Sequence, residues 1–362
     1  KNLDFLNHEY MTGSYSTIYM SRNRVRSWDE QSFTIQAQGR HAPIHPNAPK
    51  MVKVHKDKFI FQPGKENLYR RLSVREVARI QTFPDKIVFS GNRREQCILV
   101  GNAVPPLLSA KIAKEIKKHI LEKNYKFFNK NLVRKKFEKR SFKLIKFKSK
   151  QNPKVFLDLF SGVGGFSIGL KRAGYQQVLS ADNDKSVIQT HKHNFPNIPI
   201  VEDGLQNKET EKKILDIING REIDLLVGGP PCQGFSIFGN RRFVNTKEFD
   251  PKSDKRNNLV LTFWRYAELI KPRWVIMENV GGFPSLEKGY FLRKIVTLLP
   301  RIGYKNFDYR ILNAADYGVP QKRKRFILIA NRTNNLIPWP KPKFFQEPKD
   351  WQKPYRTVGE VI

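Results

Sequence analysis

The sequence predicts an α/β protein with a mainly parallel sheet, beside a smaller and more irregular module. Between residues 153 and 331, short runs rich in β-branched residues alternate with amphipathic stretches of helical length. This alternation is typical of βαβ units, which build a parallel sheet with helices packed on it. The outer parts of the 362-residue chain lack the alternation. We therefore expect one α/β domain and a second module.

The elements of the α/β domain follow one another from residue 153. Strands are expected where apolar residues run together, at 154–160, 176–182, 198–202, 223–228, 274–279 and 325–331, with a further strand within 304–316. Helices are expected where apolar residues recur at helical spacing, near 165–173, 184–194, 208–218, 257–270 and 288–300. Two earlier helices are expected, one after Ser73, whose Glu76 completes a capping box, and one from Pro106 to about Lys123.

Three other segments differ in composition from this domain. Residues 1–70 are rich in aromatic, Arg, His and Pro residues with weak periodicity, which favours an irregular β and loop module. Residues 332–362 are rich in Pro, Lys and Trp, and we expect compact order to fall off there. Residues 123–150 hold twelve Lys or Arg against one Glu. Such a run is typical of a solvated connector, and it also suits an arm that contacts phosphates.

The overall charge points to a polyanionic partner. Lys and Arg outnumber Asp and Glu by 67 to 33, which gives a net charge of +34. Nucleic acid and a membrane surface both attract such a chain, but no apolar run is long enough to span a membrane. No secretory leader opens the sequence, so a cytoplasmic location is expected. Nucleic acid is therefore the favoured partner, and no membrane is expected.

A glycine-rich turn follows the first strand of the α/β domain. Residues 161–166 read Ser-Gly-Val-Gly-Gly-Phe, and such glycines let a ligand approach the backbone at a helix N-terminus, although a simple tight turn is the alternative. Ser167 stands where a nicotinamide-binding fingerprint needs glycine, which disfavours an oxidoreductase. Asp182 and Asp203 end the next two strands. Each could accept hydrogen bonds from a ribose or an adenine, or could instead cap a helix.

The fourth strand leads to a cysteine on a loop. Pro230 and Pro231 restrict the backbone before Cys232, and Gly234 lets it turn, so the thiol should be presented rather than buried. A reactive cysteine needs such partial exposure and a lowered pKa. Cys97 is the other cysteine, and it is expected to be a small core residue. Two cysteines are too few for a disulfide framework.

Charged residues near that loop could form hydrogen bonds to a bound heterocyclic ring. Glu278 ends the next strand, and neighbouring parallel strands end at the same edge of a sheet, so its carboxyl group should lie near Cys232. A buried carboxyl group could stay protonated and donate to a ring nitrogen, with helix capping as the alternative. Gln321, Arg323 and Arg325 alternate and so share one face of an extended segment. An arginine on that face could hold a base oxygen.

Taken together, these residues resemble the motifs of the DNA (cytosine-5) methyltransferase family. The matching runs are 158–165, Asp182, Asp203, 230–233, 278–280, 321–325, 71–84, and Gln96 with 101–105. The last two precede the first, which resembles a circular permutation of the family's order. The resemblance implies a target-recognition domain in two pieces (332–362, then 1–70), a hinge motif with helices returning to the catalytic domain (71–122), a basic linker (123–152) and a catalytic domain (153–331).

The resemblance also implies a fold, a methyl donor and a chemistry. The fold would be a Rossmann-like methyltransferase fold that binds S-adenosylmethionine and needs no metal. Cys232 would add to C6 of a cytosine flipped out of duplex DNA, Glu278 would hold its N3 and amino group, and Arg323 or Arg325 would bind O2. Gln233 and Ser236 would close over the DNA. The implied cofactor-binding residues are Asp158, Phe160, Gly162, Gly164, Gly165, Asp182, Asn183, Asp203, Gly204, Pro230, Asn102 and Val104.

Two further segments suggest a target. Residues 20–28 and 33–40 resemble the recognition segment of bacterial enzymes that methylate GGCC. Arg22, Arg24 and Arg40 would contact guanines there, or only phosphates. The implied setting is a restriction-modification system, in which a cognate restriction endonuclease would be the functional partner. The protein is expected to be a monomer in the bacterial cytoplasm, associated with the nucleoid. The alternatives are a transfer-RNA cytosine-5 methyltransferase and a catalytically inactive DNA-binding protein.

Overall fold

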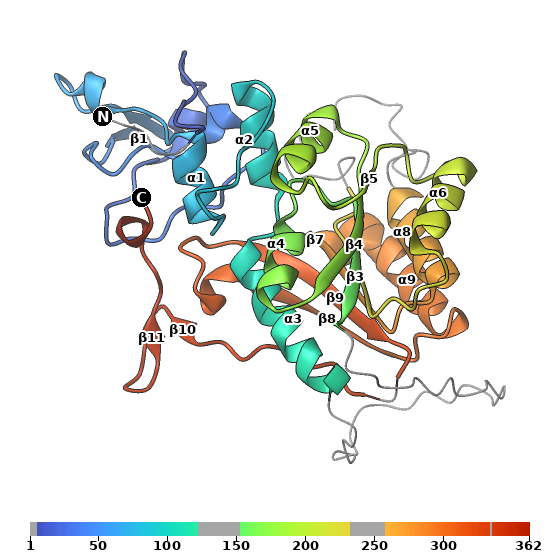
Figure 1. Cartoon of the computed structure of the whole chain (residues 1–362). Helices are drawn as coiled ribbons and strands as arrows, with labels where there is room; N and C mark the ends of the chain where they lie inside the picture. The colour runs from blue at the N-terminus through green and yellow to red at the C-terminus, as the bar shows by residue number, and fades with distance from the viewer. Residues whose placement is uncertain (1–5, 122–152, 232–257, 334) are drawn as a thin grey trace.

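A seven-stranded sheet forms the centre of the larger lobe in the computed structural model, which describes residues 6–121, 153–231, 258–333 and 335–362 (Figure 1). The strands are β3 (Val155–Leu159), β4 (Gln176–Ala181), β5 (Ile200–Val201), β6 (Leu225–Gly228), β7 (Trp274–Val280), β8 (Asn306–Asn313) and β9 (Lys324–Asn331). Their order is β5-β4-β3-β6-β7-β9-β8, and β9 runs antiparallel to both of its neighbours. The expected mainly parallel α/β sheet is confirmed.

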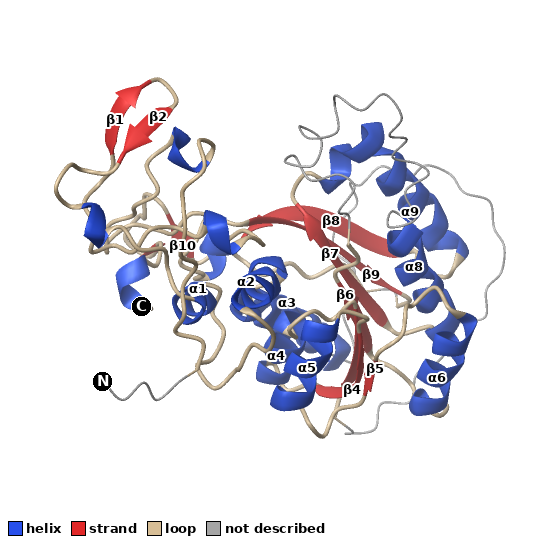
Figure 2. Cartoon of the chain, turned by 90° about the horizontal axis from the view of Figure 1, so that it is seen from above, coloured by secondary structure: helices blue, strands red, loops and turns tan. Residues whose placement is uncertain are grey.

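Helices cover both faces of this sheet (Figure 2). They are α3 (Pro106–Leu121), α4 (Gly165–Arg172), α5 (Lys185–Asn194), α6 (Lys208–Ile218), α8 (Asn258–Ile270) and α9 (Tyr290–Arg301). Successive residues of a strand point to opposite faces, so Leu226 packs in the core beneath α6, α8 and α9, whereas Leu225 and Val227 pack beneath α3 and α4. Both faces of β6 are therefore fully buried, as its continuous apolar run predicts.

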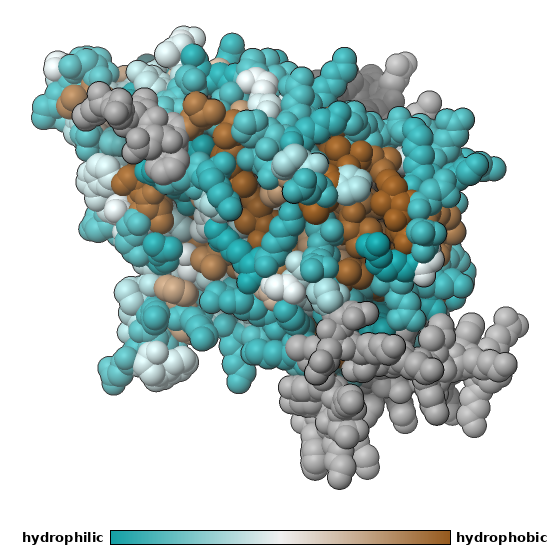
Figure 3. Space-filling view, viewed as in Figure 1, coloured by the Kyte–Doolittle hydropathy of each residue, from teal (hydrophilic) through white to brown (hydrophobic). Residues whose placement is uncertain are grey.

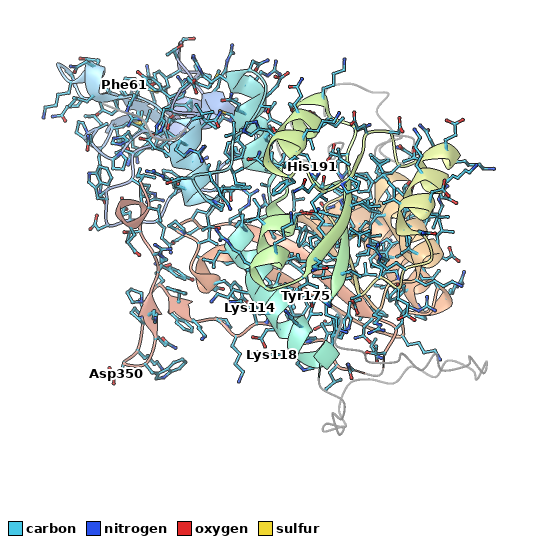
Figure 4. All side chains as sticks on the ribbon, viewed as in Figure 1. Phe61, Lys114, Lys118, Tyr175, His191 and Asp350 are labelled. Carbon is cyan, nitrogen blue, oxygen red and sulfur yellow. The ribbon has the colours of Figure 1, made fainter. Side chains whose placement is uncertain are left out.

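Helices α3 and α4 pack with unusually close backbones. A Cβ atom added at Gly169 of α4 would lie 1.7 Å from Ser109 Oγ and 2.5 Å from Pro106 O of α3. The Ser109 hydroxyl lies 3.3 and 3.2 Å from the carbonyl oxygens of Gly165 and Phe166. Figure 4 shows Lys114 and Lys118 along α3, and both lysines are exposed. The contact joins the segment before residue 122 to the start of the α/β domain.

Replacing Gly169 with alanine should destabilise the protein, although alanine normally favours a helix over glycine. The new methyl group would overlap Ser109 and the α3 backbone, so we expect the free energy of unfolding to fall by about 1–3 kcal/mol in denaturant titration. Gly282→Ala is the matched control, because nothing lies within 4 Å of a Cβ added there. Equal stability of the two variants would contradict this packing.

The smaller lobe contains the first segment of the chain and its last. It is mostly loops and short 3-10 helices, with a hairpin of β1 (Val52–His55) and β2 (Lys58–Ile60) standing out from it in Figure 2. The backbone amides of Val358 and Gly359 donate to the carbonyl oxygens of Glu30 and Trp28. Val358 is 2% exposed. The expectation that compact order falls off after residue 332 is therefore wrong for the described part of this segment.

A third core joins the two lobes. It contains residues of the small lobe such as Ile35, of α1 (Val74–Ile80) and α2 (Arg93–Asn102), and of the larger lobe such as Val163 and Ile168. The sequence predicted α1, with its Ser73–Glu76 capping box, but missed α2. Figure 3 shows polar residues over most of one face, with apolar residues gathered near its middle. No helix among the described residues is long and apolar enough to cross a membrane.

Candidate active site at the carboxyl ends of the strands

The strand order changes direction at β3. From β3 the chain proceeds through β4 to β5 on one side, and through β6 to β7 on the other. In open α/β sheets, ligands bind outside the carboxyl ends of the strands where this reversal occurs. The ends of β3, β4 and β6 therefore define the candidate site.

The turn after β3 has a backbone that glycine favours. Phe160, Gly162 and Gly164 all have positive φ angles, of 55°, 50° and 80°. A phenylalanine in this conformation is strained, and such strain gathers at functional sites. The Ser161 hydroxyl is buried without a hydrogen-bond partner, and nothing lies within 4 Å of a Cβ added at Gly162. The turn thus offers open space and an unused hydroxyl group.

The two acids after β4 and β5 lie in different surroundings. The backbone amides of Gly162 and Asp184 donate to the Asp182 carboxylate at 2.9 and 3.1 Å, and burial raises the pKa of Asp182. Asn183 is exposed beside it. Asp203 is partly exposed and pairs with Lys213 at 2.7 Å, while the Gly204 that follows is partly buried. Asp182 is therefore held against the glycine-rich turn, and Asp203 lies nearer to solvent.

Asp158 is buried within β3 rather than at its end. Its Oδ2 accepts a hydrogen bond of 2.6 Å from the Ser167 hydroxyl of α4. The side chain is 0% exposed, and burial raises its pKa to about 8. Gln177 donates to the same Ser167 hydroxyl at 2.7 Å. This carboxyl group belongs to a polar network between β3, β4 and α4, which sequence spacing alone did not reveal.

The segment that follows α2 packs closely against the glycine-rich turn after β3. A Cβ added at Gly165 would lie 2.1 Å from Val104 O, so only glycine allows this approach. Val104 is buried, and Asn102 is exposed at the end of α2. The structure thus brings residues that precede position 122 into contact with residues that follow position 152.

The loop that carries the candidate nucleophile begins beside Glu278. Cys232, Gln233 and Ser236 lie outside the described residues, which end here at Pro231. A Cβ added at Gly229 would lie 3.1 Å from Glu278 Oε2, and β6 pairs with β7 at Gly228 and Met277. The Asn279 amide donates to Pro230 O at 3.1 Å. Glu278 and Asn279 therefore flank the start of the cysteine loop.

Glu278 and Arg325 form a buried ion pair. Arg325 Nε lies 2.8 Å from Glu278 Oε1, with side-chain exposures of 13% and 10%. Burial raises the pKa of Glu278, and the positive charges of Arg325 and Arg323 oppose that shift. We infer a carboxyl group that holds its proton to a higher pH than a free glutamate does.

The structure separates the two arginines that the sequence left as alternatives. Arg323 is 0% exposed, and its guanidinium donates to the carbonyl oxygens of Ile35, Gly101 and Ala103 at 2.8, 2.6 and 3.0 Å. Arg325 contacts Glu278 instead. Arg323 therefore links the segment that leads into β9 to the backbone of Ile35 and of the α2 region, and Arg325 is the arginine that contacts the Glu278 carboxyl group.

The three arginines that the sequence suggested as base contacts differ in their exposure. Arg22 and Arg40 are exposed. Arg24 is 5% exposed, and it donates to the carbonyl oxygens of Tyr19 and Ile18 at 2.7 and 3.0 Å. The expectation that Arg22 and Arg24 share one exposed face is wrong here, because Arg24 folds back onto the 3-10 helix Tyr19–Ser21. Only Arg22 and Arg40 are presented at the surface.

No metal centre accompanies these groups in the described ranges. Residues 6–121, 153–231, 258–333 and 335–362 contain no group of three His, Cys, Asp or Glu side chains that could hold a metal ion.

Comparisons with known proteins place the chain in a family. The family model described as C-5 cytosine-specific DNA methylase matches residues 3–118 and 155–361. The type II methyltransferase M.MthTI of Methanothermobacter thermautotrophicus is 62% identical over 33% of this chain and 37% of its own length. M1.HphI of Haemophilus parahaemolyticus is 36% identical over 58% of this chain and 52% of its own length. M.AquIA of Picosynechococcus is 35% identical over 58% of this chain and 88% of its own length.

Proposed function

Because the chain belongs to the C-5 cytosine-specific DNA methylase family, we propose that it transfers a methyl group from S-adenosylmethionine to C5 of cytosine in duplex DNA. The observation that carries this proposal is the Glu278 carboxyl group beside Gly229, three residues before Cys232. The chain spans about a third to a half of the length of M.MthTI and M1.HphI, so activity is inferred from its own residues as well.

The chemistry follows from the weak nucleophilicity of cytosine C5. The Cys232 thiolate attacks C6, which forms a C–S bond and pushes the ring electrons toward C5. Glu278 donates to N3 as negative charge develops there, and Arg325 holds O2 and the Glu278 carboxyl group in place. C5 would take the methyl group from the donor's sulfonium sulfur, which would leave as a neutral thioether. C5 then loses its proton to a base, the C5–C6 double bond re-forms, and the C–S bond breaks to release the Cys232 thiolate. The target base must leave the duplex stack for this attack.

The candidate site fits the methyl donor that the family uses. Asp182, held by two backbone amides, can accept from ribose hydroxyls, and Asp203 can accept from an adenine amino group. The unused Ser161 hydroxyl and the open space at Gly162 leave room beside the turn. When bound, S-adenosylmethionine supplies an electrophilic methyl group. The remaining residues proposed to line the donor site are Phe160, Gly164, Gly165, Asn183, Gly204, Pro230, Asn102 and Val104.

We include the permuted motif order and the two-piece recognition domain in this proposal. The close contact of α3 with α4, and that of Val104 with Gly165, support it, because they bring the early motifs beside the later ones. The pairing of residues 358–359 with Trp28 and Glu30 supports a recognition domain made from both ends of the described chain.

For the target we propose GGCC, in a restriction-modification setting. The support is the similarity of residues 20–28 and 33–40 to the recognition segment of enzymes with that specificity, and the exposure of Arg22 and Arg40. Arginine is well suited to bidentate contact with guanine O6 and N7.

Arg22→Ala and Arg24→Ala should have different effects. Arg22→Ala should weaken discrimination between GGCC and scrambled duplexes by about 1–3 kcal/mol in equilibrium binding, because a base contact is lost. Arg24→Ala should lower the thermal midpoint, because the carbonyl groups of Tyr19 and Ile18 lose their donor. Equal weakening by Arg22→Ala on both duplexes would identify a phosphate contact and contradict base reading.

The function is tested by labelled methyl transfer to GGCC duplex, scrambled duplex and transfer RNA. We expect incorporation into the GGCC duplex alone. Preferential labelling of transfer RNA would favour the RNA methyltransferase alternative. No labelling by a folded protein that binds both donor and duplex would favour the inactive DNA-binding alternative.

A further inference from the structure

A segment of the small lobe lies directly along the segment that leads into β9. The amide of Ser32 donates to Pro320 O at 3.0 Å, and the amide of Lys322 donates to Ser32 O at 3.3 Å. These bonds form a parallel bridge between Ser32 and Gln321. The Thr34 hydroxyl then donates to Lys322 O. Residues 32–35 and 320–323 thus form a short paired ribbon, which we call the lobe ribbon.

Two buried side chains fasten this ribbon. Gln321 Oε1 accepts from the Ile35 amide at 3.1 Å, and Gln321 Nε2 donates to Gln81 Oε1 at 2.7 Å. The Arg323 guanidinium donates to Ile35 O, and also to Gly101 O and Ala103 O in the α2 segment. A buried arginine that donates to carbonyl groups instead of pairing with a carboxylate is costly, so its position calls for a reason beyond packing.

The ribbon continues into the ion pair of the site. Two residues after Arg323, Arg325 on β9 lies opposite Val280 of β7 and contacts Glu278. On the other side, the chain leaves Ile35 for Gln36 and Ala37, whose backbone would lie 2.4 to 2.5 Å from a Cβ added at Gly101. Exposed Arg40 follows shortly after. A displacement of the recognition segment would therefore be transmitted through a few hydrogen bonds to Arg325.

We propose that the lobe ribbon couples target recognition to catalysis, with Thr34, Gln321 and Arg323 as positioning residues that set Arg325 against Glu278. This inference rests on the proposed methyltransferase function. Engagement of a correct DNA site by the small lobe holds residues 32–35 in place, and the ribbon then fixes the ion pair. On an incorrect DNA site Arg325 and Glu278 are held less firmly. Correct and incorrect sites therefore differ in the rate of methyl transfer as well as in binding affinity.

The sharpest variant is Thr34→Val, because Thr34 is exposed and its hydroxyl makes one bond across the ribbon. Thr297→Val on α9 is the matched control, since that exposed hydroxyl also makes one bond to a backbone carbonyl, at 2.9 Å from Arg293 O. Gln321→Met is a second variant that keeps the volume of the side chain and removes its hydrogen bonds to Ile35, Gln81 and Ile80. Circular dichroism and thermal melting would establish that each variant folds.

Two quantities are measured with the duplex that the wild type methylates best and with the same duplex changed at one base pair. They are the dissociation constant, and the single-turnover rate at saturating duplex and donor. The rate ratio is the rate on the best duplex divided by the rate on the changed duplex. We expect Thr34→Val to lower this ratio about three- to tenfold and to leave the ratio of the two dissociation constants unchanged. Gln321→Met should lower the rate ratio further, and Thr297→Val should change neither ratio.

A purely structural ribbon would give a different result. Loss of stability, or an equal fall in both rates, with an unchanged rate ratio in Thr34→Val and Gln321→Met would overturn the coupling while leaving the methyltransferase proposal intact. Absence of methyl transfer by the folded wild type would instead overturn the proposed function and the coupling with it.

Discussion

Cys232→Ala is expected to abolish methyl transfer while leaving the binding of donor and duplex intact. The thiol is the only group proposed to form a bond to cytosine C6, and without that bond C5 remains too weak a nucleophile to accept a methyl group. Loss of an essential nucleophile costs an enzyme on the order of 10⁴- to 10⁶-fold in rate. Labelled methyl transfer under single-turnover conditions measures the loss.

A duplex with fluorine in place of hydrogen at the target C5 makes the covalent step visible. The proton that must leave after methyl transfer is then absent, so the wild type should remain attached to the DNA through its C–S bond. Denaturing electrophoresis should show this complex for the wild type and not for Cys232→Ala, with Cys97→Ala as the matched control. Cys97 is 6% exposed, and burial raises its pKa to about 11, so its thiol is poorly suited to attack. Persistence of the complex in Cys232→Ala would contradict the assignment.

Glu278→Gln is expected to slow methyl transfer by about 100- to 1,000-fold, the usual cost of removing one group that stabilises developing charge. The amide keeps the size of the side chain but loses the ionisable proton and the carboxyl group that contacts Arg325. Single-turnover rates at saturating donor and duplex measure the effect. Glu268→Gln, on α8 away from the site, is a matched control for the loss of one carboxylate.

The pH dependence tests the same residue in a second way. Burial raises the pKa of Glu278, so its carboxyl group keeps the proton it would donate to N3 at pH values where a free glutamate has lost it. The methyl-transfer rate should therefore fall as the pH rises through this raised pKa, and the fall should be missing in Glu278→Gln. An identical pH profile for both proteins would show that the proton on Glu278 plays no part.

The sheet was predictable because its signals are local. Most strands of the larger lobe contain a short apolar run, although β8 at the edge of the sheet is largely polar, and most of the expected bounds differ from those of the structure by at most two residues. The position of Glu278 beside Gly229, where the chain leaves β6, followed from the rule that parallel strands end at one edge. Helix α2 was missed although Asn92 and Glu95 form a capping box, because charged and polar residues fill its first turn.

Other features depend on contacts between distant parts of the chain. The order of residues after 335 relies on Val358 and Gly359 meeting Glu30 and Trp28, which no local pattern indicates. The alternation of Arg22 and Arg24 suggested one extended face, but the backbone carbonyl groups of Ile18 and Tyr19 draw Arg24 inward. Arg323 and Arg325 differ for a similar reason, since one meets the small lobe and the other meets Glu278. Gln81 gave no signal of its role in the sequence.

Identification of the methylated nucleoside tests the account most directly. Duplex DNA would be incubated with the protein and labelled S-adenosylmethionine, digested to nucleosides and separated by chromatography with authentic standards. The proposed attack at C6 predicts that all label migrates as 5-methyl-2′-deoxycytidine, and that none appears with Cys232→Ala. Label in N4-methyl-2′-deoxycytidine or N6-methyl-2′-deoxyadenosine would contradict the account, because methylation of an exocyclic amine needs neither the cysteine nor activation of C5.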